Sequence, residues 1–324
     1  MGKKIILIGC GNIGSRHLQA LARIPFDIEV DICEPNKEAQ KLAQSRLAEI
    51  QNVKGNHNYY WYESIDQITK SSDLSIIATT SVGRVDVIDK LLRSGCKRFL
   101  VEKVVCQSKE EYDHLLSIMR KNNAKGWVNT NLRYFKTYQK IHEFFEHDKI
   151  IHLSVIASNI SALGTNAIHY MDLFSWLVND YMIKLNGDFL LNELYSNKRG
   201  QHLVEFGGTL IGSVKTGSTI VMTFIPDTNL PTVVNIAGTD KHVIFDETNE
   251  KAINLMNGKL ETLSYRYEHA SSLTTEIVQD ILEKDNCMLT SLDDSYHLHC
   301  ELFRVFNAHI KKVTNTESKL CPIT

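Results

Sequence analysis

Residues 5–14 read Ile5-Ile6-Leu7-Ile8-Gly9-Cys10-Gly11-Asn12-Ile13-Gly14, an apolar run followed at once by three glycines. Four aliphatic residues in a row are typical of a strand that is buried on both faces, as in a parallel sheet. Gly9 permits a tight turn, Gly11 lets the backbone approach a pyrophosphate, and Gly14 lets the next helix pack closely on the strand. The sequence therefore predicts a strand, a phosphate-binding loop and a helix over residues 15–23.

A second apolar strand, residues 28–33, ends at Glu34, about 20 residues after the last glycine of the loop. A carboxylate here can bind both hydroxyls of an adenosine ribose and repels a 2′-phosphate, which favours NAD over NADP. The start of the helix after the loop offers free N–H groups and a positive dipole to a phosphate. A methyltransferase loop would carry glycine in place of Ile13, which argues against that alternative. We expect the cofactor to contact Gly9, Gly11, Asn12, Ile13, Gly14 and Glu34.

The composition excludes several classes of partner. The formal net charge of -2 gives no electrostatic basis for binding nucleic acid or an anionic membrane. No apolar run has the length of a membrane helix, and the first strand begins too early for a signal peptide. The seven cysteines occur without C-x-x-C pairs, which fits reduced thiols in a cytoplasm and gives no zinc site. His297 and His299 point apart on a predicted helix, so we expect no metal there.

Strands and helices alternate up to residue 128 and predict a doubly wound parallel sheet, a Rossmann domain over residues 1–128. Further strands are expected at residues 59–62, 74–79, 98–101 and 125–128, with helices at 37–47, 82–94 and 108–121. Thr79, Thr80 and Ser81 follow one strand, and Glu102 and Lys103 follow the next, at the sheet edge where ligands bind. From its position alone, Lys103 is either a desolvated lysine that exchanges protons near neutral pH or a solvated lysine paired with Glu102.

Residues 129–324 predict a second, α+β domain with an open, mainly antiparallel sheet. We expect a helix at 135–145, a strand at 150–157, and a loop at 159–166 that enters a helix carrying His169 and Asp172. Strands follow between residues 189 and 256, including a hairpin of 202–214 with 218–224, and helices at 273–282 and 296–310 close the domain. Helices on one face would leave the other face apolar and open, which predicts a homodimer or homotetramer.

With these residues in view, the chain resembles the family of glucose-fructose oxidoreductase, inositol dehydrogenase and the rhizopine-catabolism proteins. The matching segments, in the family's order, are residues 9–17, Ala78-Thr79, Glu102-Lys103, Asn131-Leu132-Arg133 and residues 164–172. The resemblance implies hydride transfer between nicotinamide and a secondary alcohol of a sugar, polyol or nucleotide sugar. It assigns catalysis to Lys103 and His169, and it implies substrate contacts from Lys103, Arg133, Thr165, Asn166, His169 and Asp172.

Three departures separate the chain from the family's motifs. Val104 replaces the proline of an E-K-P motif, and Thr165 replaces the aspartate of a D-x-x-x-H motif that ends at the histidine. Thr80, Ser81 and Arg84 stand where a T-P-N-x-x-H motif supplies proline, asparagine and histidine. Because Thr165 replaces the aspartate, a catalytically weak NAD-binding regulator and a merely structural His169 remain alternatives. A lyase or glycosidase that uses bound NAD for transient oxidation is a third, since the same site starts either reaction.

Overall fold

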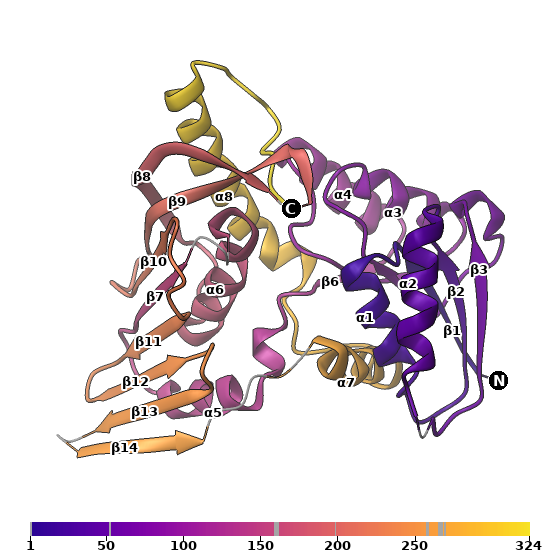
Figure 1. Ribbon diagram of the computed structural model, residues 1–324, viewed down its shortest axis with the longest axis horizontal. Coiled ribbons are helices and arrows are strands. Elements are labelled where there is room, and N and C mark those ends of the chain that lie inside the picture. Colours follow the sequence, from indigo (N-terminus) through magenta and orange to yellow (C-terminus); the bar gives the residue numbers. More distant parts are fainter. Residues whose placement is uncertain are drawn as a thin grey trace. The chain divides into compact units, whose positions relative to one another are not determined.

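The computed structural model describes residues 2–51, 53–158, 162–197, 199–256, 259–264, 268 and 270–324. The chain divides into two compact units (Figure 1). Unit 1 comprises residues 1–106, 110–134 and 268–293, and unit 2 comprises residues 107–109, 135–267 and 294–324. The sequence led us to expect a single boundary after residue 128. The difference arises because the helix at residues 270–284 packs against the helix after the glycine-rich loop, in unit 1.

Unit 1 is built on a six-stranded sheet, sheet A, in the order β3-β2-β1-β4-β5-β6, and every neighbouring pair is parallel. Between β1 and β4 the order of the strands reverses, and ligands of such sheets bind outside the carboxyl ends of the strands at that point. This order confirms the predicted doubly wound sheet. The strands are β1 (Lys3–Ile8), β2 (Ile28–Cys33), β3 (His57–Tyr62), β4 (Leu74–Ile77), β5 (Arg98–Val101) and β6 (Lys125–Val128).

The helices of unit 1 follow the predicted segments, with shifted ends. The first helix begins three residues earlier than expected because Gly11 is its N-cap and the loop continues directly into it. The third begins at Arg84, later than expected, because Gly83 before it has a left-handed φ of 67°. The helices are α1 (Asn12–Leu21), α2 (Lys37–Ala48), α3 (Arg84–Arg93), α4 (Lys109–Lys121) and α7 (Ala270–Lys284), with short 3-10 helices at Ile65–Gln67 and Asn131–Tyr134.

Unit 2 contains an eight-stranded sheet, sheet B, in the order β14-β13-β12-β11-β7-β10-β9-β8. All neighbouring pairs are antiparallel except β7 with β10, so the predicted mainly antiparallel sheet is confirmed. The strands are β7 (His152–Ser158), β8 (Lys184–Asn197), β9 (Gly200–Ser213), β10 (Thr219–Ile225), β11 (Val233–Ala237), β12 (Lys241–Asp246), β13 (Lys251–Met256) and β14 (Lys259–Ser264).

Two strands of sheet B differ from the prediction. β8 begins at Lys184, before the predicted residue 189. The prediction missed this start because breaks in the register of β8 with β9 interrupt the alternation by which a strand is recognised. β14 was not predicted at all. The expected hairpin is present as β9 and β10.

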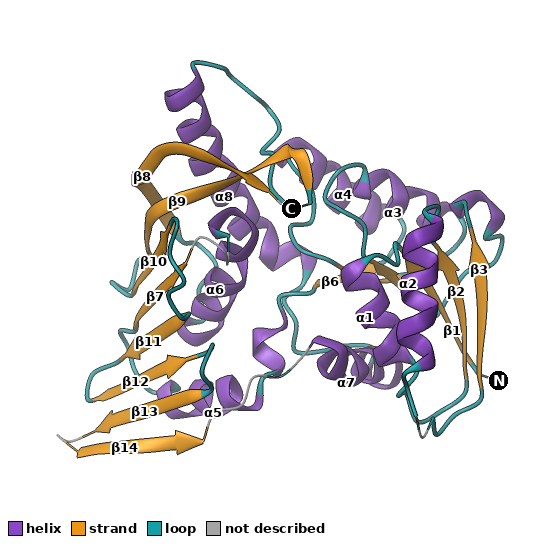
Figure 2. Cartoon of the chain, in the orientation of Figure 1, coloured by secondary structure: helices purple, strands orange, loops and turns teal. Residues whose placement is uncertain are grey.

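Three helices cover one face of sheet B, as Figure 2 shows for α5 (Lys136–Phe145), α6 (Leu163–Val178) and α8 (Leu292–Thr314). α6 begins at Leu163, so Thr165 and Asn166 belong to its start and not to the predicted loop, of which residues 159–161 lie outside the described residues. Side chains along β7 and β10 alternate between buried and open, and Ile156 on the open face is 47% exposed. No helix in the described ranges combines the length and the apolar character that a membrane span needs.

Candidate functional site

The glycine-rich loop lies at the carboxyl end of β1, beside the end of β4. Gly9 has φ +82°, and a Cβ atom on it would come within 3.0 Å of the backbone of Ala78 and Thr79. A Cβ atom on Gly14 would lie 2.0 Å from the carbonyl oxygen of Gly9, so α1 can pack this closely only without a side chain there. Gly11 instead borders open space, since a Cβ atom on it would meet nothing within 4 Å. Gly9 and Gly14 therefore have the steric roles that the sequence predicted.

The first turn of α1 is suited to an anion. Within the described residues, no side chain caps this helix and its first turn holds no acidic residue. Arg46 from α2 donates to the carbonyl oxygen of Asn12 (3.0 Å) and to Ser15 Oγ (2.6 Å), which places a guanidinium at this turn. Amides, helix dipole and guanidinium together favour a phosphate. Arg46 was not predicted, because only the packing of α2 on α1 brings it here.

The Glu34 carboxylate is fixed beside the loop. Its Oε2 accepts a hydrogen bond from the Cys10 amide (2.7 Å) and its Oε1 accepts one from the Asn36 amide (2.9 Å). A carboxylate has about four acceptor positions, so it can still accept ribose hydroxyls. Lys37, the nearby cation that would favour a 2′-phosphate, pairs with Glu63. The loop, the start of α1 and Glu34 thus fit a dinucleotide.

Glu102 is the centre of a buried polar network at the end of β5. Its Oε1 bonds His17 Nε2 (3.0 Å) and accepts from Asn129 Nδ2 (2.5 Å), while His17 Nδ1 bonds Thr274 Oγ1 (2.9 Å). Burial alone would raise the pKa of Glu102, but the bonds from His17 and Asn129 and the charges of His17 and Lys103 lower it to about 2. The carboxylate beside Lys103 is therefore ionised at neutral pH. The roles of His17 and Asn129 were not predicted, although His17 lies only three residues after the last glycine of the motif.

This network predicts a defined acid sensitivity. Because the Glu102 pKa is lower in the folded chain than its ordinary 4.5, its stabilising contribution is complete above about pH 4.5 and is lost as pH falls towards 2. Glu102→Gln should therefore lower the free energy of unfolding by about 3 kcal/mol at pH 6 and by little near pH 2. Urea unfolding across this range measures the difference, with Glu38→Gln on the exposed face of α2 as control. A difference that stays constant from pH 6 to pH 2 would contradict it.

Arg84 joins the ends of β4 and β5. Its guanidinium donates to the carbonyl oxygens of Thr79, Glu102 and Val104, and at 3.4 Å to that of Val105, although the side chain is only 1% exposed. Two of these carbonyls lie on either side of Lys103. Where the family has proline after the lysine, this chain fixes the same backbone with a buried arginine. The sequence identified Arg84 only as a departure from the family's T-P-N-x-x-H motif and did not predict its bonds to these carbonyls.

Lys103 is 6% exposed, so the structure favours the buried of the two predicted environments over a solvated lysine. Of the three predicted residues near the end of β4, Thr79 is half-buried and Thr80 exposed, whereas Ser81 is buried. Arg133 lies in the 3-10 helix at Asn131–Tyr134, is 5% exposed, and its charge acts on the thiol of Cys287. In unit 1 the predicted residues therefore lie at the carboxyl ends of β1, β2, β4 and β5, except Arg133, which follows β6.

In unit 2 the predicted residues lie on α6. Thr165 is buried in its first turn, Asn166 and His169 are half-buried, and Asp172 is fully buried. The residue that the sequence did not predict is Glu205 on β9, whose carboxylate accepts hydrogen bonds from the Gly164 amide (2.7 Å) and from Thr165 Oγ1. Nothing in the sequence pattern pairs residues 165 and 205, because they meet only through the packing of α6 on β9.

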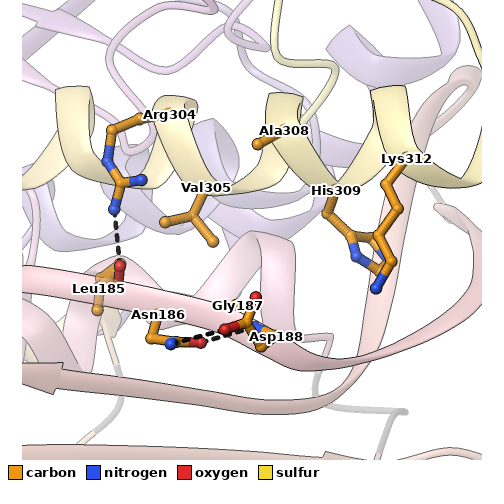
Figure 3. A pocket seen from close by; sticks show the side chains of 9 residues that line it. All are labelled: Leu185, Asn186, Gly187, Asp188, Arg304, Val305, Ala308, His309 and Lys312. Carbon is orange, nitrogen blue, oxygen red and sulfur yellow. Dashed lines mark hydrogen bonds between the residues drawn. The ribbon is translucent and has the colours of Figure 1, made fainter.

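A separate cavity of about 260 Å³ lies between α8 and the irregular part of β8 (Figure 3). Two of its polar side chains bond the fold: Arg304 donates to the carbonyl of Leu185 (2.6 Å) and pairs with Glu301 (2.7 Å), and His309 Nε2 bonds the carbonyl of Leu191. None of the predicted site residues lines it. The lining residues are Leu185, Asn186, Gly187, Asp188, Arg304, Val305, Ala308, His309 and Lys312.

Comparison with known families gives a match over residues 3–130, to the model described as oxidoreductase family, NAD-binding Rossmann fold. This domain belongs to the Gfo/Idh/MocA oxidoreductase family. The match confirms the family that the motifs resemble and the oxidoreductase class. No curated protein matches the chain.

Solved structures share the fold of the whole chain. An oxidoreductase from Agrobacterium radiobacter, in complex with NAD+, L-tartaric acid and magnesium, has a TM-score of 0.74 at 14% identity, covering 97% of each chain. The UDP-N-acetylglucosamine 3-dehydrogenase GnnA from Acidithiobacillus ferrooxidans has a TM-score of 0.74 at 14% identity, covering 97% of this chain and 99% of that chain. KijD10, a 3-ketoreductase from Actinomadura kijaniata in complex with NADP and TDP-benzene, has a TM-score of 0.69 at 14% identity, covering 94% and 96%.

Proposed function

We propose that this protein is an NAD-dependent oxidoreductase that transfers a hydride between nicotinamide and a secondary alcohol of a sugar, polyol or nucleotide sugar. The observation that carries the proposal is the buried Lys103, placed directly after an ionised Glu102 at the ligand edge of a Gfo/Idh/MocA dinucleotide domain. A lysine withdrawn from water beside a fixed carboxylate is suited to act on a substrate hydroxyl.

The cofactor would be held by residues of unit 1. The amides at the start of α1 would bind the pyrophosphate, and Glu34 would bind the ribose hydroxyls. The ends of β4 and β5, with Thr79, Thr80, Ser81 and Glu102, would border the nicotinamide half. Bound NAD supplies a hydride acceptor or donor at its nicotinamide ring.

Two residues of the chain would act on the substrate hydroxyl. His169 suits the role of the base, because the ordinary pKa of histidine is near neutral pH. Lys103, when charged, would stabilise the oxyanion that develops on the same oxygen. The other proposed substrate-binding residues are Arg133, Thr165, Asn166 and Asp172.

The fold relatives support a carbohydrate substrate. GnnA is a UDP-N-acetylglucosamine 3-dehydrogenase and KijD10 is a 3-ketoreductase bound to a TDP ligand, so a nucleotide sugar is the first class to test. We also place the protein in the cytoplasm, because all seven of its cysteines are free thiols.

The deciding experiment measures NADH release during steady turnover over a panel of polyols, sugars and nucleotide sugars. A dehydrogenase releases one NADH for each product formed. A lyase or glycosidase that uses bound NAD would form product without net NADH, and a regulator would bind NAD and form neither. A protein that binds NAD and forms neither product nor NADH would refute the proposed activity. That outcome draws support from Thr165, which stands on α6 where the family's motif has an aspartate.

Cofactor choice gives a second test. Glu34→Gln keeps the size and the acceptor oxygen of the side chain but removes the charge that repels a 2′-phosphate. We expect the preference for NADH over NADPH to fall by about tenfold or more, because the charge that repels the 2′-phosphate is lost. A tenfold change in relative affinity corresponds to about 1.4 kcal/mol. Fluorescence titrations with both nucleotides measure it, and Glu38→Gln on α2 should change neither affinity. A wild-type protein that binds NADPH more tightly than NADH would contradict the assignment.

We further propose that two copies associate through the open face of sheet B. Ile156 on β7 is 47% exposed and Ile225 on β10 is 36% exposed, and by the register of the two strands both belong to the open positions that alternate with the buried ones. A sheet face of this kind is usually covered by a partner. We expect light scattering to give a dimer or tetramer at micromolar concentration, and Ile156→Glu to shift it to monomer while Leu42→Glu on α2 does not. A monomeric wild type would refute this proposal.

A further inference from the structure

The first turn of α6, the helix that carries His169, takes its cap from another element. Ala162 is the N-cap residue and provides no side-chain bond, and the turn has no acidic residue of its own. The carboxylate of Glu205, on β9, supplies both the hydrogen-bond acceptor and the negative charge that this turn lacks. Its Oε2 accepts from the amides of Gly164 (2.7 Å) and Thr165 (3.3 Å), the N2 and N3 amides that a capping side chain normally binds.

The other oxygen of the carboxylate holds polar side chains. Glu205 Oε1 accepts from Thr165 Oγ1 and from Asn197 Nδ2 (2.7 Å), and Asn197 also donates to Thr165 Oγ1 at 3.3 Å. Glu205 is 3% exposed, so nearly all of its hydration has been replaced by these donors. A carboxylate with several donors at the positive end of a helix is stabilised in its ionised form.

The approach of Glu205 depends on a glycine. A Cβ atom on Gly164 would lie 2.8 Å from Glu205 Oε2 and 3.1 Å from Ile323 Cγ2. β9 is held at this point, because the Val204 amide donates to the carbonyl oxygen of Pro322 (2.8 Å). Gly164 and Glu205 therefore form a fitted pair that fixes the charge against the first turn of α6.

We propose that Glu205 is the positioning residue for His169 and supplies, from β9, the carboxylate that the family's motif supplies at position 165. Thr165 and His169 are one helical turn apart on the same face of α6, so the carboxylate bound to Thr165 places its negative charge near the imidazole. The threonine is then not a loss of function: it makes room for Glu205 and bonds it. This inference rests on the proposed dehydrogenase function, in which His169 acts on the substrate.

The test moves the charge between the two positions. Glu205→Gln keeps the size of the side chain and should lower kcat about tenfold at a temperature well below its melting point, with the Kd of NADH unchanged. Adding Thr165→Asp to that variant should recover most of the lost kcat, whereas adding Thr165→Asn, its neutral match, should not. Thr165→Asp alone should lower kcat and stability, because two carboxylates then share one site.

A purely structural cap gives a different pattern. Glu205→Gln would then lower the melting temperature while kcat of the folded protein stays at the wild-type value, and that result would overturn the proposal. If Glu205→Gln does not fold, Thr165→Val is measured in its place, because it removes the hydroxyl that bonds the carboxylate and leaves Glu205 itself unchanged. A kcat of Thr165→Val equal to that of the wild type would then overturn the proposal. Failure of the proposed function is seen separately, as absence of turnover by the wild-type protein.

Discussion

Replacing Lys103 with methionine should reduce kcat about a hundredfold or more while the affinity for NADH changes little. The change removes the ammonium group but keeps most of the length of a side chain that is only 6% exposed, so the packing is largely retained. Loss of a group that transfers a proton or stabilises an oxyanion has this magnitude in most enzymes. His169→Asn should have an effect of the same order, because the imidazole is the proposed base.

Matched controls separate chemistry from folding in this experiment. Lys125→Met removes an exposed lysine of β6 that pairs with Asp285, and His152→Gln removes an exposed histidine of β7. Both should turn over as the wild type does. If Lys103→Met and His169→Asn turn over the substrate at the wild-type rate, both residues are structural and the proposed function fails at its centre.

Much of the fold could be predicted because it is specified by local sequence. The apolar strand, the three glycines and the carboxylate at Glu34 act through steric and electrostatic effects within one βαβ unit, so residues 5–34 contain most of the information. Gly9 and Gly14 have in the structure the steric roles that their spacing predicted. The ends of α3 and of α1 were shifted, since helix ends depend on a single φ angle or cap that periodicity does not report.

The parts that could not be predicted depend on contacts between distant residues. Residues 270–284 form a helix whose periodicity was recognised, but nothing in it indicated that it packs on α1 in unit 1. The bond between His17 and Glu102 and the contact of Thr165 with Glu205 likewise join segments far apart in the chain. At two of the departures from the family's motifs, Val104 and Thr165, a side chain from elsewhere in the fold bonds the altered segment. The sequence motif alone therefore shows what is missing at these positions, and only the fold shows which side chains bond there.

The replacement with the largest expected effect on stability is Arg84. Arg84→Met should lower the free energy of unfolding by about 3–5 kcal/mol, because it leaves the carbonyls of Thr79, Glu102 and Val104 buried without their donor. The free energy of unfolding of Arg84→Lys should lie between those of the wild type and Arg84→Met. An ammonium keeps the charge, but it lacks the planar fork of donors that reaches several carbonyls at once. Thermal and urea unfolding measure both differences.

The control is on the same helix. Arg93 at the end of α3 pairs with Asp89 at the surface, where ion pairs contribute roughly 0–1 kcal/mol, so Arg93→Met should be nearly neutral. Arg84 also bonds the carbonyls on both sides of Lys103, so a folded Arg84→Lys variant should lose kcat in parallel with stability. Were Arg84→Met to unfold like Arg93→Met, the buried guanidinium would not be what fixes the Lys103 backbone. The replacement of the family's proline by Val104 would then need another explanation.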